Sequence, residues 1–477
     1  MDKNFTLDKG AIPAFAAAPP KLKFLDVTFY AIVATIGIRW LPVAAALGPA
    51  SLPLWLLALF TFYVPLSVAT VELTARYAGN GSLYGWARDG FGPLAGFVCG
   101  WFYWVSLLPY FAGIIYFMSG LVLSSVGVDA HNTTLYLATS VVIACAATAL
   151  QLLGLRFIKW LPNIGASGSW LIFFLLLFAA IVLLWRGAGA TNFAAASYVP
   201  RFNFDTAILW GTMVFALGGS ETVAFLRADI HGGMRTIRQV LTALGIAMVA
   251  IYMVGTAAML VILPQADLTR LSGLTDALHA AFSRVGFSSL AILAIVGFAL
   301  SQFGGLTAWF GIGARLPVEA GIDSFLPPVF AARHEKTGAP VAAILLQGGL
   351  TLVMVVLSQA GENAAAAYDF LVAMSVLTST IPYVFVFAVY LSHKRWRDDA
   401  TAWCPPGGTR TSLALGYVGM AATLTAIACT LVPSNADAQP LMTLLKIVIS
   451  TSVMLAVGLL LYWLGMRRRK ALQAAAA

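Results

Sequence analysis

The chain has 477 residues, of which 60% are hydrophobic and only 10% charged, and its formal net charge is +9. About a quarter of the residues of a soluble domain are charged, so this composition excludes a water-soluble enzyme and indicates a protein of the lipid bilayer. The basic residues lie between apolar segments and form no basic domain, which argues against a nucleic-acid partner. The four cysteines form no CxxC pair, so we expect no metal site, disulfide framework or cofactor.

The hydropathy of the chain predicts twelve apolar segments that are long enough to cross a bilayer, which takes about 20 residues per helix. Their approximate limits are 24–48, 53–72, 94–123, 134–154, 161–185, 206–229, 237–263, 287–314, 340–358, 367–391, 412–432 and 440–465. The stretch 267–285 carries several charged residues and is predicted to be an amphipathic helix at the surface. The sequence therefore predicts an all-α polytopic membrane protein.

The distribution of basic residues predicts how the segments are oriented. If the segments alternate and the N-terminus lies inside, twenty-two of the 28 Lys and Arg residues fall on the cytoplasmic side and four outside. Cytoplasmic loops carry such an excess of positive charge. We therefore expect a multi-pass protein of the cell (inner or plasma) membrane with both termini in the cytoplasm.

The first segment is interrupted near its middle by IGIRWLP at 36–42, and the sixth by ALGGS at 216–220. These segments lie five spans apart and so run in opposite directions. Paired interruptions of this kind are typical of transporters with inverted repeats, whose substrate binds between the two breaks. The predicted substrate-binding residues are Gly37, Ile38, Arg39, Phe215, Ala216, Leu217, Gly218, Gly219 and Ser220.

The repeat predicts how the chain is organised. A cytoplasmic N-tail at 1–23 precedes the first repeat at 24–186, and an extracytoplasmic loop at 187–205 leads to the second repeat at 206–392. A cytoplasmic loop at 393–411, two further helices in 412–465 and a basic cytoplasmic tail at 466–477 complete the prediction.

Two charged residues lie deep in the interrupted segments. A charge near the centre of the bilayer costs at least about 2.5 kcal/mol unless it is paired or hydrated. We interpret Arg39 as the group that binds a carboxylate of the substrate, the alternative being an ion pair that only holds the segment in place. Burial disfavours the charged form of a carboxylate, so Glu221 is predicted to exchange protons for coupling; it could instead pair with Arg39 or cap free N–H groups.

The glycines at the breaks allow the backbone to leave helical geometry. Free N–H groups would then suit a substrate carboxylate and free carbonyl groups its ammonium, although small residues also serve close helix packing. Phe215 is the predicted lid. Further candidates for a gate or pocket, which could equally be packing residues, are Tyr103, Trp104, Gln302, Thr307 and Ser375. Thr307 is also the one hydroxyl we nominate for sodium coupling.

No HExxH, GxSxG or phosphate-loop motif occurs in the chain. The sequence therefore favours neither an enzyme nor an ATP-driven pump. We expect transport to draw on a proton gradient or on a counter-substrate.

The pattern resembles the amino acid–polyamine–organocation superfamily. The matching parts are AAALGP at 44–49, VELTARY at 71–77, GNGSLYGW at 79–86, FGPLAGF at 91–97, the aromatic Phe215 followed by GSE at 219–221, the stretch from Trp309 to APV at 339–341, and PPGG at 405–408. The resemblance covers about 22–465 and is nearest to glutamate:GABA antiporter-like amino acid permeases. The chain departs from the family where IRW at 38–40 replaces a glycine-rich break and GGMR at 232–235 replaces an Asn-Pro.

This resemblance implies a five-plus-five inverted repeat with two added helices, an aromatic gate at Phe215 and proton sensing or coupling at Glu221. We therefore expect a secondary transporter of an amino acid or a close derivative, neutral or acidic because of Arg39, working by proton coupling or exchange. One alternative is a transporter of polyamines or other organic ions with the same fold. Another is a non-transporting amino acid sensor, for whose signalling domain we expect the predicted tails to be too short.

Overall fold

The computed structural model describes residues 22–77, 83–128, 131–153, 161–201, 203–319, 325–326, 340–358, 364–392, 403–432 and 440–476. The predicted N-tail up to residue 21, the glycine-rich loop 79–82 and loop residues 393–402 lie outside this part of the chain. Within it, the secondary structure is helical, with one isolated β-bridge and no strand.

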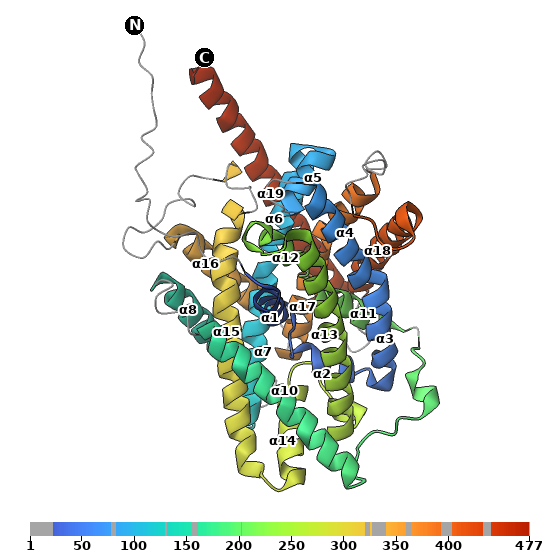
Figure 1. The fold of residues 1–477 in the computed structure, drawn as a ribbon. Helices are drawn as coiled ribbons and strands as arrows, with labels where there is room; N and C mark the ends of the chain where they lie inside the picture. The colour runs from blue at the N-terminus through green and yellow to red at the C-terminus, as the bar shows by residue number, and fades with distance from the viewer. Residues whose placement is uncertain are drawn as a thin grey trace, which may run out of the picture.

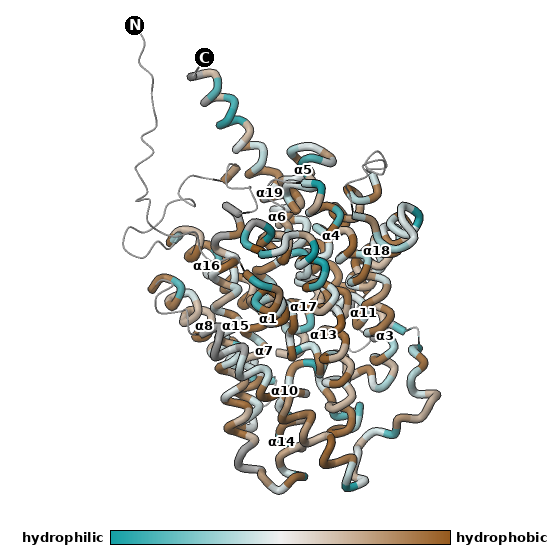
Figure 2. Tube along the Cα trace, in the orientation of Figure 1, coloured by the Kyte–Doolittle hydropathy of each residue, from teal (hydrophilic) through white to brown (hydrophobic). Residues whose placement is uncertain are grey.

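Ten helices of the described chain are long and apolar enough to cross a membrane. Their elements are α3 (Ser51–Ala58), η2 (Leu59–Tyr63) and α4 (Val64–Arg76) in one span, α6 (Pro93–Val105) and α7 (Leu107–Ser125) in a second, then α8 (Thr133–Leu152), α10 (Leu161–Trp185), α13 (Gly233–Ile262), α15 (Ser288–Glu319), α16 (Val341–Ser358), α17 (Ala364–Ser392), α18 (Gly408–Thr430) and α19 (Pro440–Ala476). Figure 1 shows them as one bundle, and Figure 2 shows apolar residues along their lengths. The predicted class, an all-α polytopic membrane protein, is confirmed.

Two further helical segments are interrupted, as the sequence predicts. The first consists of α1 (Phe24–Thr35) and α2 (Trp40–Ala45), and the second of α11 (Phe204–Ala216) and α12 (Thr222–Phe225). Ile36 ends α1 in an extended conformation, and Gly219 has a φ of +92° that only glycine adopts readily. If each pair makes one crossing, the total is the expected twelve, a number that stays a prediction.

One short element, η1 (Gly48–Ala50), begins the span Gly48–Arg76. The short helices between the spans are α5 (Leu83–Phe91), α14 (Gly273–Val285) and the one-turn elements η3 (Ala195–Tyr198), η4 (Arg227–Asp229) and η5 (Gln265–Asp267). α14 confirms the amphipathic helix expected in 267–285, since Leu274 and Leu278 are buried and Arg284 is exposed.

The spans differ in how far they are buried by the rest of the protein. The span of α6 and α7 is 83% buried and that of α19 only 17%. In a bilayer, the apolar residues that stay exposed on an outer helix face lipid. The helix pair α6–α7 therefore belongs to the core of the bundle and α19 to its rim, and Figure 1 shows α1 near the centre beside α13.

The chain leading into α1 is bonded to the chain that follows α12. The N–H of Leu22 donates to the carbonyl of Asp229 at 2.7 Å, and the N–H of His231 donates to the carbonyl of Leu22 at 2.8 Å. Arg227 of η4 donates to the carbonyls of Thr74 and Tyr77, the latter at 3.1 Å. These bonds tie both interrupted segments to the end of α4.

Candidate functional site

The two interruptions face each other in the core. The hydroxyl of Tyr252, on α13, accepts a hydrogen bond from the N–H of Gly37 and donates one to the carbonyl of Ala216, both at 3.2 Å. The rings of Trp40 and Phe215 meet edge to face with centroids 5.4 Å apart. One tyrosine thus bridges the two breaks, and the residues predicted to form one site are brought together.

Most backbone groups at the breaks already have partners. Besides Gly37, the N–H groups of Trp40 and Leu41 donate to carbonyls of the same break. At the second break the N–H of Gly219 donates to the hydroxyl of Tyr383 at 3.0 Å, and that of Gly218 to the carbonyl of Phe215. In this conformation the backbone offers few free donors, so recognition of a charged ligand falls mainly to side chains.

Arg39 is buried, with 3% of its surface exposed. Its guanidinium carbon lies 4.1 Å from the centroid of the Trp40 ring and 4.5 Å from that of the Tyr110 ring. Nη1 is buried without a hydrogen-bond partner, and no ion pair joins Arg39 to any carboxylate of the described chain. Aromatic rings engage the faces of a guanidinium, whereas its edge donates hydrogen bonds. Nη1 is therefore a buried donor that lacks an acceptor among the described residues.

Two rings, those of Trp40 and Tyr110, contact this guanidinium, and the rings of Phe215 and Trp309 pack against them. We call these four side chains the aromatic cluster. The Tyr110 ring lies 6.0 Å from that of Phe215 and 6.4 Å from that of Trp309, between centroids. The cluster joins α2, α7, α11 and α15. Phe215, the predicted lid, thus lies against the ring that covers Arg39.

Glu221 is the second buried charge, with 1% of its surface exposed. Its Oε1 accepts hydrogen bonds from the hydroxyls of Tyr103 and Tyr383, both at 3.1 Å, while Oε2 is buried without a partner in the described chain. The structure therefore gives Glu221 two tyrosines as partners and not Arg39. A buried carboxylate with one free oxygen is a site where a proton can bind.

The positions of two tyrosines separate the two charged groups along the bundle. Tyr103 contacts Glu221, and Tyr110, seven residues later, covers Arg39. Seven residues of helix rise about 10 Å. Arg39 and Glu221 thus have separate surroundings, and each contacts a different part of the α6–α7 span.

Of the other nominated residues, only Tyr103 contacts the site. The indole N–H of Trp104 donates to the carbonyl of Gly313 at 3.1 Å. The hydroxyls of Thr307 and Ser375 donate to carbonyls of their own helices at 2.9 and 2.7 Å. Gln302 is half-buried on α15. Ile38, Leu217 and Ser220 are buried at the breaks.

Sequence reasoning missed Tyr252 and Tyr383, which hold the two breaks and Glu221. Each is a tyrosine inside an apolar segment, and a buried hydroxyl there needs a hydrogen-bond partner. That signal was present, but the partner of Tyr383, Glu221, lies 162 residues away in the chain.

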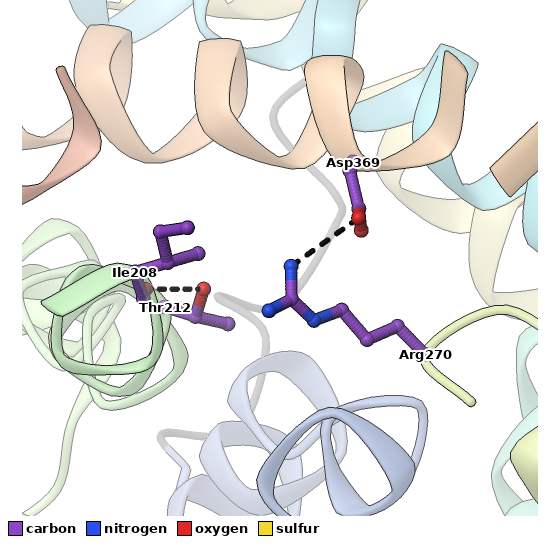
Figure 3. A network of polar contacts seen from close by, with 4 residues as sticks. All are labelled: Ile208, Thr212, Arg270 and Asp369. Atoms are coloured by element: carbon purple, nitrogen blue, oxygen red, sulfur yellow. Dashed lines mark hydrogen bonds and ion pairs between the residues drawn. The ribbon is translucent and has the colours of Figure 1, made fainter. Parts of the chain in front are cut away.

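A second polar contact lies outside the breaks. Nη1 of Arg270, which precedes α14, lies 3.2 Å from Oδ2 of Asp369 on α17. Figure 3 shows the Arg270 side chain extended toward Asp369. This ion pair links the surface helix α14 to the helix that carries Tyr383. Elsewhere in the described chain, no three His, Cys, Asp or Glu residues gather as a metal site.

Comparison with known proteins gives a consistent picture. The sequence pattern of the family described as "Amino acid permease" matches residues 22–457. An uncharacterized transporter of Legionella pneumophila is 23% identical over 87% of this chain and 90% of its own. A probable agmatine/putrescine antiporter of Lactococcus lactis is also 23% identical, over 76% of this chain and 78% of its own. A manganese transporter of Eremococcus coleocola has the same fold, with a TM-score of 0.56, 12% identity and 94% of each chain covered.

Proposed function

The chain belongs to the amino acid permease family of membrane transporters, and from this premise we propose that it carries an amino acid, neutral or acidic, by alternating access. It is a multi-pass membrane protein with a small-molecule substrate, and not an enzyme. The substrate binds between the two breaks, where Arg39 holds its carboxylate and Phe215 closes over it.

Arg39 is the observation that supports this substrate class. A buried hydrogen-bond donor without a partner costs about 1–3 kcal/mol, more when it is charged. The rings of Trp40 and Tyr110 contact the guanidinium and leave Nη1 unpaired among the described residues. A carboxylate accepts from a guanidinium edge in a strong, charge-assisted hydrogen bond and so removes that cost.

Glu221 supports coupling to protons or an exchange that depends on them. Its free Oε2 lies in the core, and its Oε1 is held by tyrosines from α6 and α17. A change of protonation there alters hydrogen bonds to two helices at once. Binding of a proton can in this way favour one conformation of the transporter over another.

An organic cation is the second candidate substrate. The relative from Lactococcus lactis carries the name of an agmatine/putrescine antiporter, and aromatic clusters bind organic cations. Arg39 opposes this candidate, because the repulsion between its charge and a dication must be overcome on binding.

The excess of Lys and Arg in alternate loops supports a plasma- or inner-membrane location with both termini in the cytoplasm. The symmetry of the two interrupted segments supports repeats at 24–186 and 206–392.

Uptake into proteoliposomes tests the substrate class. Radiolabelled alanine, glutamate, GABA, agmatine and putrescine are offered with and without a pH gradient. We expect uptake of at least one carboxylate-bearing compound and a KM about 10- to 100-fold higher for Arg39→Lys, since lysine keeps the charge but loses the planar donor edge.

The matched control is Arg88→Lys, because the Arg88 guanidinium also lies over a tyrosine ring, that of Tyr84 at 5.6 Å, but is exposed on α5. Its KM should equal that of the wild type. Efficient putrescine uptake without uptake of any amino acid would refute the proposal.

A further inference from the structure

We propose that the guanidinium of Arg39 occupies a cation-binding position between the rings of Trp40 and Tyr110, which we call the aromatic cage, and thereby excludes free organic cations from the site. Because this cation belongs to a side chain of the protein, we call it a tethered cation. The inference rests on the proposed function in one respect, namely that ligands enter between the two breaks. It makes Arg39 the residue that sets the charge of the ligand, in addition to its contact with a carboxylate.

The cage is formed by the Trp40 and Tyr110 rings, which lie 4.1 and 4.5 Å from the guanidinium carbon. Both distances are within the range of about 6 Å at which a cation is attracted by a ring face. Phe215 packs against both rings and Trp309 against Tyr110, so the cage has a rigid surround. In the structure its occupant is the side chain of Arg39 itself.

A carboxylate that could pair with the second charge of an organic dication is also present. Glu221 is a buried carboxylate, and the part of α6–α7 that contacts it lies about 10 Å along the helix from the part that forms the cage. Aromatic rings and a carboxylate that are separated in this way along α6–α7 suit an elongated organic cation such as agmatine, whose guanidinium stacks on rings and whose ammonium pairs with a carboxylate.

Arg39 blocks that use in two ways. Its guanidinium occupies the space between the rings, and its charge is not cancelled by an ion pair within the described chain. A like charge that stays unneutralised in a poorly hydrated site repels a second cation strongly. Removal of the side chain is therefore expected to empty the cage and to leave Glu221 as the charge that selects the ligand.

Isothermal titration of the purified protein in lipid nanodiscs tests this inference, with agmatine, putrescine and ethylguanidinium as ligands. We expect no measurable agmatine binding by the wild type and binding at least about tenfold tighter by Arg39→Ala. Ethylguanidinium, which can refill the cage, should compete with agmatine in Arg39→Ala. Arg88→Ala is the control for loss of an exposed arginine over a tyrosine, and should behave like the wild type.

Several results would overturn the inference. One is measurable agmatine binding by the wild type, a result that does not depend on the folding of any variant. Another is the absence of cation binding by Arg39→Ala when its melting temperature, within a few degrees of that of the wild type, shows that the variant is folded. If Arg39→Ala does not fold, Arg39→Gln takes its place, and absence of a gain in that variant counts equally against the idea.

The outcome for the proposed function is read separately. If the wild type transports amino acids but Arg39→Ala gains no cation, the function stands and the tethered cation fails. If Arg39→Ala gains agmatine but the wild type moves no amino acid, the tethered cation stands and the proposed substrate class fails.

Discussion

Two buried charges at the breaks have different partners, and this difference decides what each can do. Arg39 has ring faces on its guanidinium and an unpaired donor at its edge, whereas Glu221 has two hydroxyl donors on one oxygen and none on the other. The first arrangement favours a bound anion and the second a bound proton. Because the two residues do not pair, each can change its state without first breaking an ion pair with the other.

Glu221→Gln should make uptake insensitive to pH. Glutamine keeps an oxygen that accepts from Tyr103 and Tyr383 but does not ionise. The measurement is the initial rate of uptake in proteoliposomes between pH 5 and pH 8, where the wild type should vary and Glu221→Gln should give a flat profile.

Glu72→Gln is the control for this experiment. Like Glu221, Glu72 on α4 accepts two hydrogen bonds from hydroxyl groups at Oε1. The donors are Tyr390 and Ser412, both at 2.8 Å. Its pH profile should keep the wild-type shape. An unchanged profile in Glu221→Gln would remove Glu221 from the coupling role.

Gly219→Ala should impair both stability and transport. Gly219 has a φ of +92°, and a Cβ there would lie 3.1 Å from the methyl carbon of Thr35 on α1. The positive φ costs about 1–2 kcal/mol for alanine, and the contact pushes the two interrupted segments apart. A lower melting temperature and a reduced maximal uptake rate are expected.

Gly349→Ala provides the comparison, since Gly349 lies inside α16 and a Cβ there meets no atom within 4 Å. In a helix interior this change is expected to stabilise by about 0.5–1 kcal/mol. If both variants melted alike, the backbone conformation at Gly219 would not be the constraint that we infer.

At the scale of the elements, the two breaks could be predicted from the sequence, but the tyrosines that form hydrogen bonds with them could not. Gly37 at the first break and the pair Gly218 and Gly219 at the second allow the backbone to leave helical geometry inside an apolar segment. The interruptions after Thr35 and Ala216 lie where the sequence predicts them. Tyr252 and Tyr383 act through helices that the local sequence does not connect to the breaks. Packing of distant segments decides which hydroxyl reaches which backbone group.

The two hydroxyl residues predicted as pocket candidates, Thr307 and Ser375, form hydrogen bonds that the sequence alone does not predict. Thr307 and Ser375 are predicted either to line the pocket or to serve packing, and in the structure each donates to a carbonyl within its own helix. A threonine or serine in an apolar helix can always satisfy itself in this way. Composition therefore identifies the helices around the site better than it identifies the residues that contact a substrate.

The surface helix α14 has a carboxylate whose ionisation should affect stability. Burial raises the pKa of Asp276 above its usual range, more than the hydrogen bond from Ser272 lowers it. The folded protein then holds this proton to a higher pH than the unfolded chain does. The contribution of Asp276 to the free energy of unfolding is accordingly greatest below the usual pKa of an aspartate. It is lost as the pH rises through the raised pKa of this residue.

Asp276→Asn removes this dependence. The melting temperature of Asp276→Asn minus that of the wild type should increase as the pH rises from 4 to 7. Asp229→Asn, at an exposed position, should show no such trend. A difference for Asp276→Asn that stayed constant or shrank with rising pH would contradict the prediction.

At the scale of the whole molecule, composition alone predicts a helical membrane protein, and the paired breaks predict its kind. The fold is shared with a manganese transporter at 12% identity, so the architecture survives almost complete replacement of the side chains. For the same reason the architecture does not disclose the substrate. We propose that a few side chains decide the substrate, among them Arg39, which stands where the resemblance leads one to expect a glycine-rich break.

The predicted orientation can be tested through Cys404, which is exposed just before α18 in the loop expected in the cytoplasm. In a variant that keeps only this cysteine, a membrane-impermeant maleimide should label Cys404 in permeabilised cells and not in intact ones. A cysteine introduced by Ala194→Cys, in the loop expected outside, should react in intact cells. The reverse labelling pattern would show that the orientation in the membrane is opposite to the one we predict.

The backbone bonds of Leu22 to Asp229 and His231 have a mechanical consequence. They join the start of α1 to the chain that follows α12, so neither of these two ends can move away alone while the bonds hold. A force applied to the chain ahead of Leu22, by a fused domain or a tethering protein, would therefore be transmitted to η4 and α12 and on to Glu221. If transport moves these helices as we propose, pulling on that chain should slow transport without blocking the path of the substrate.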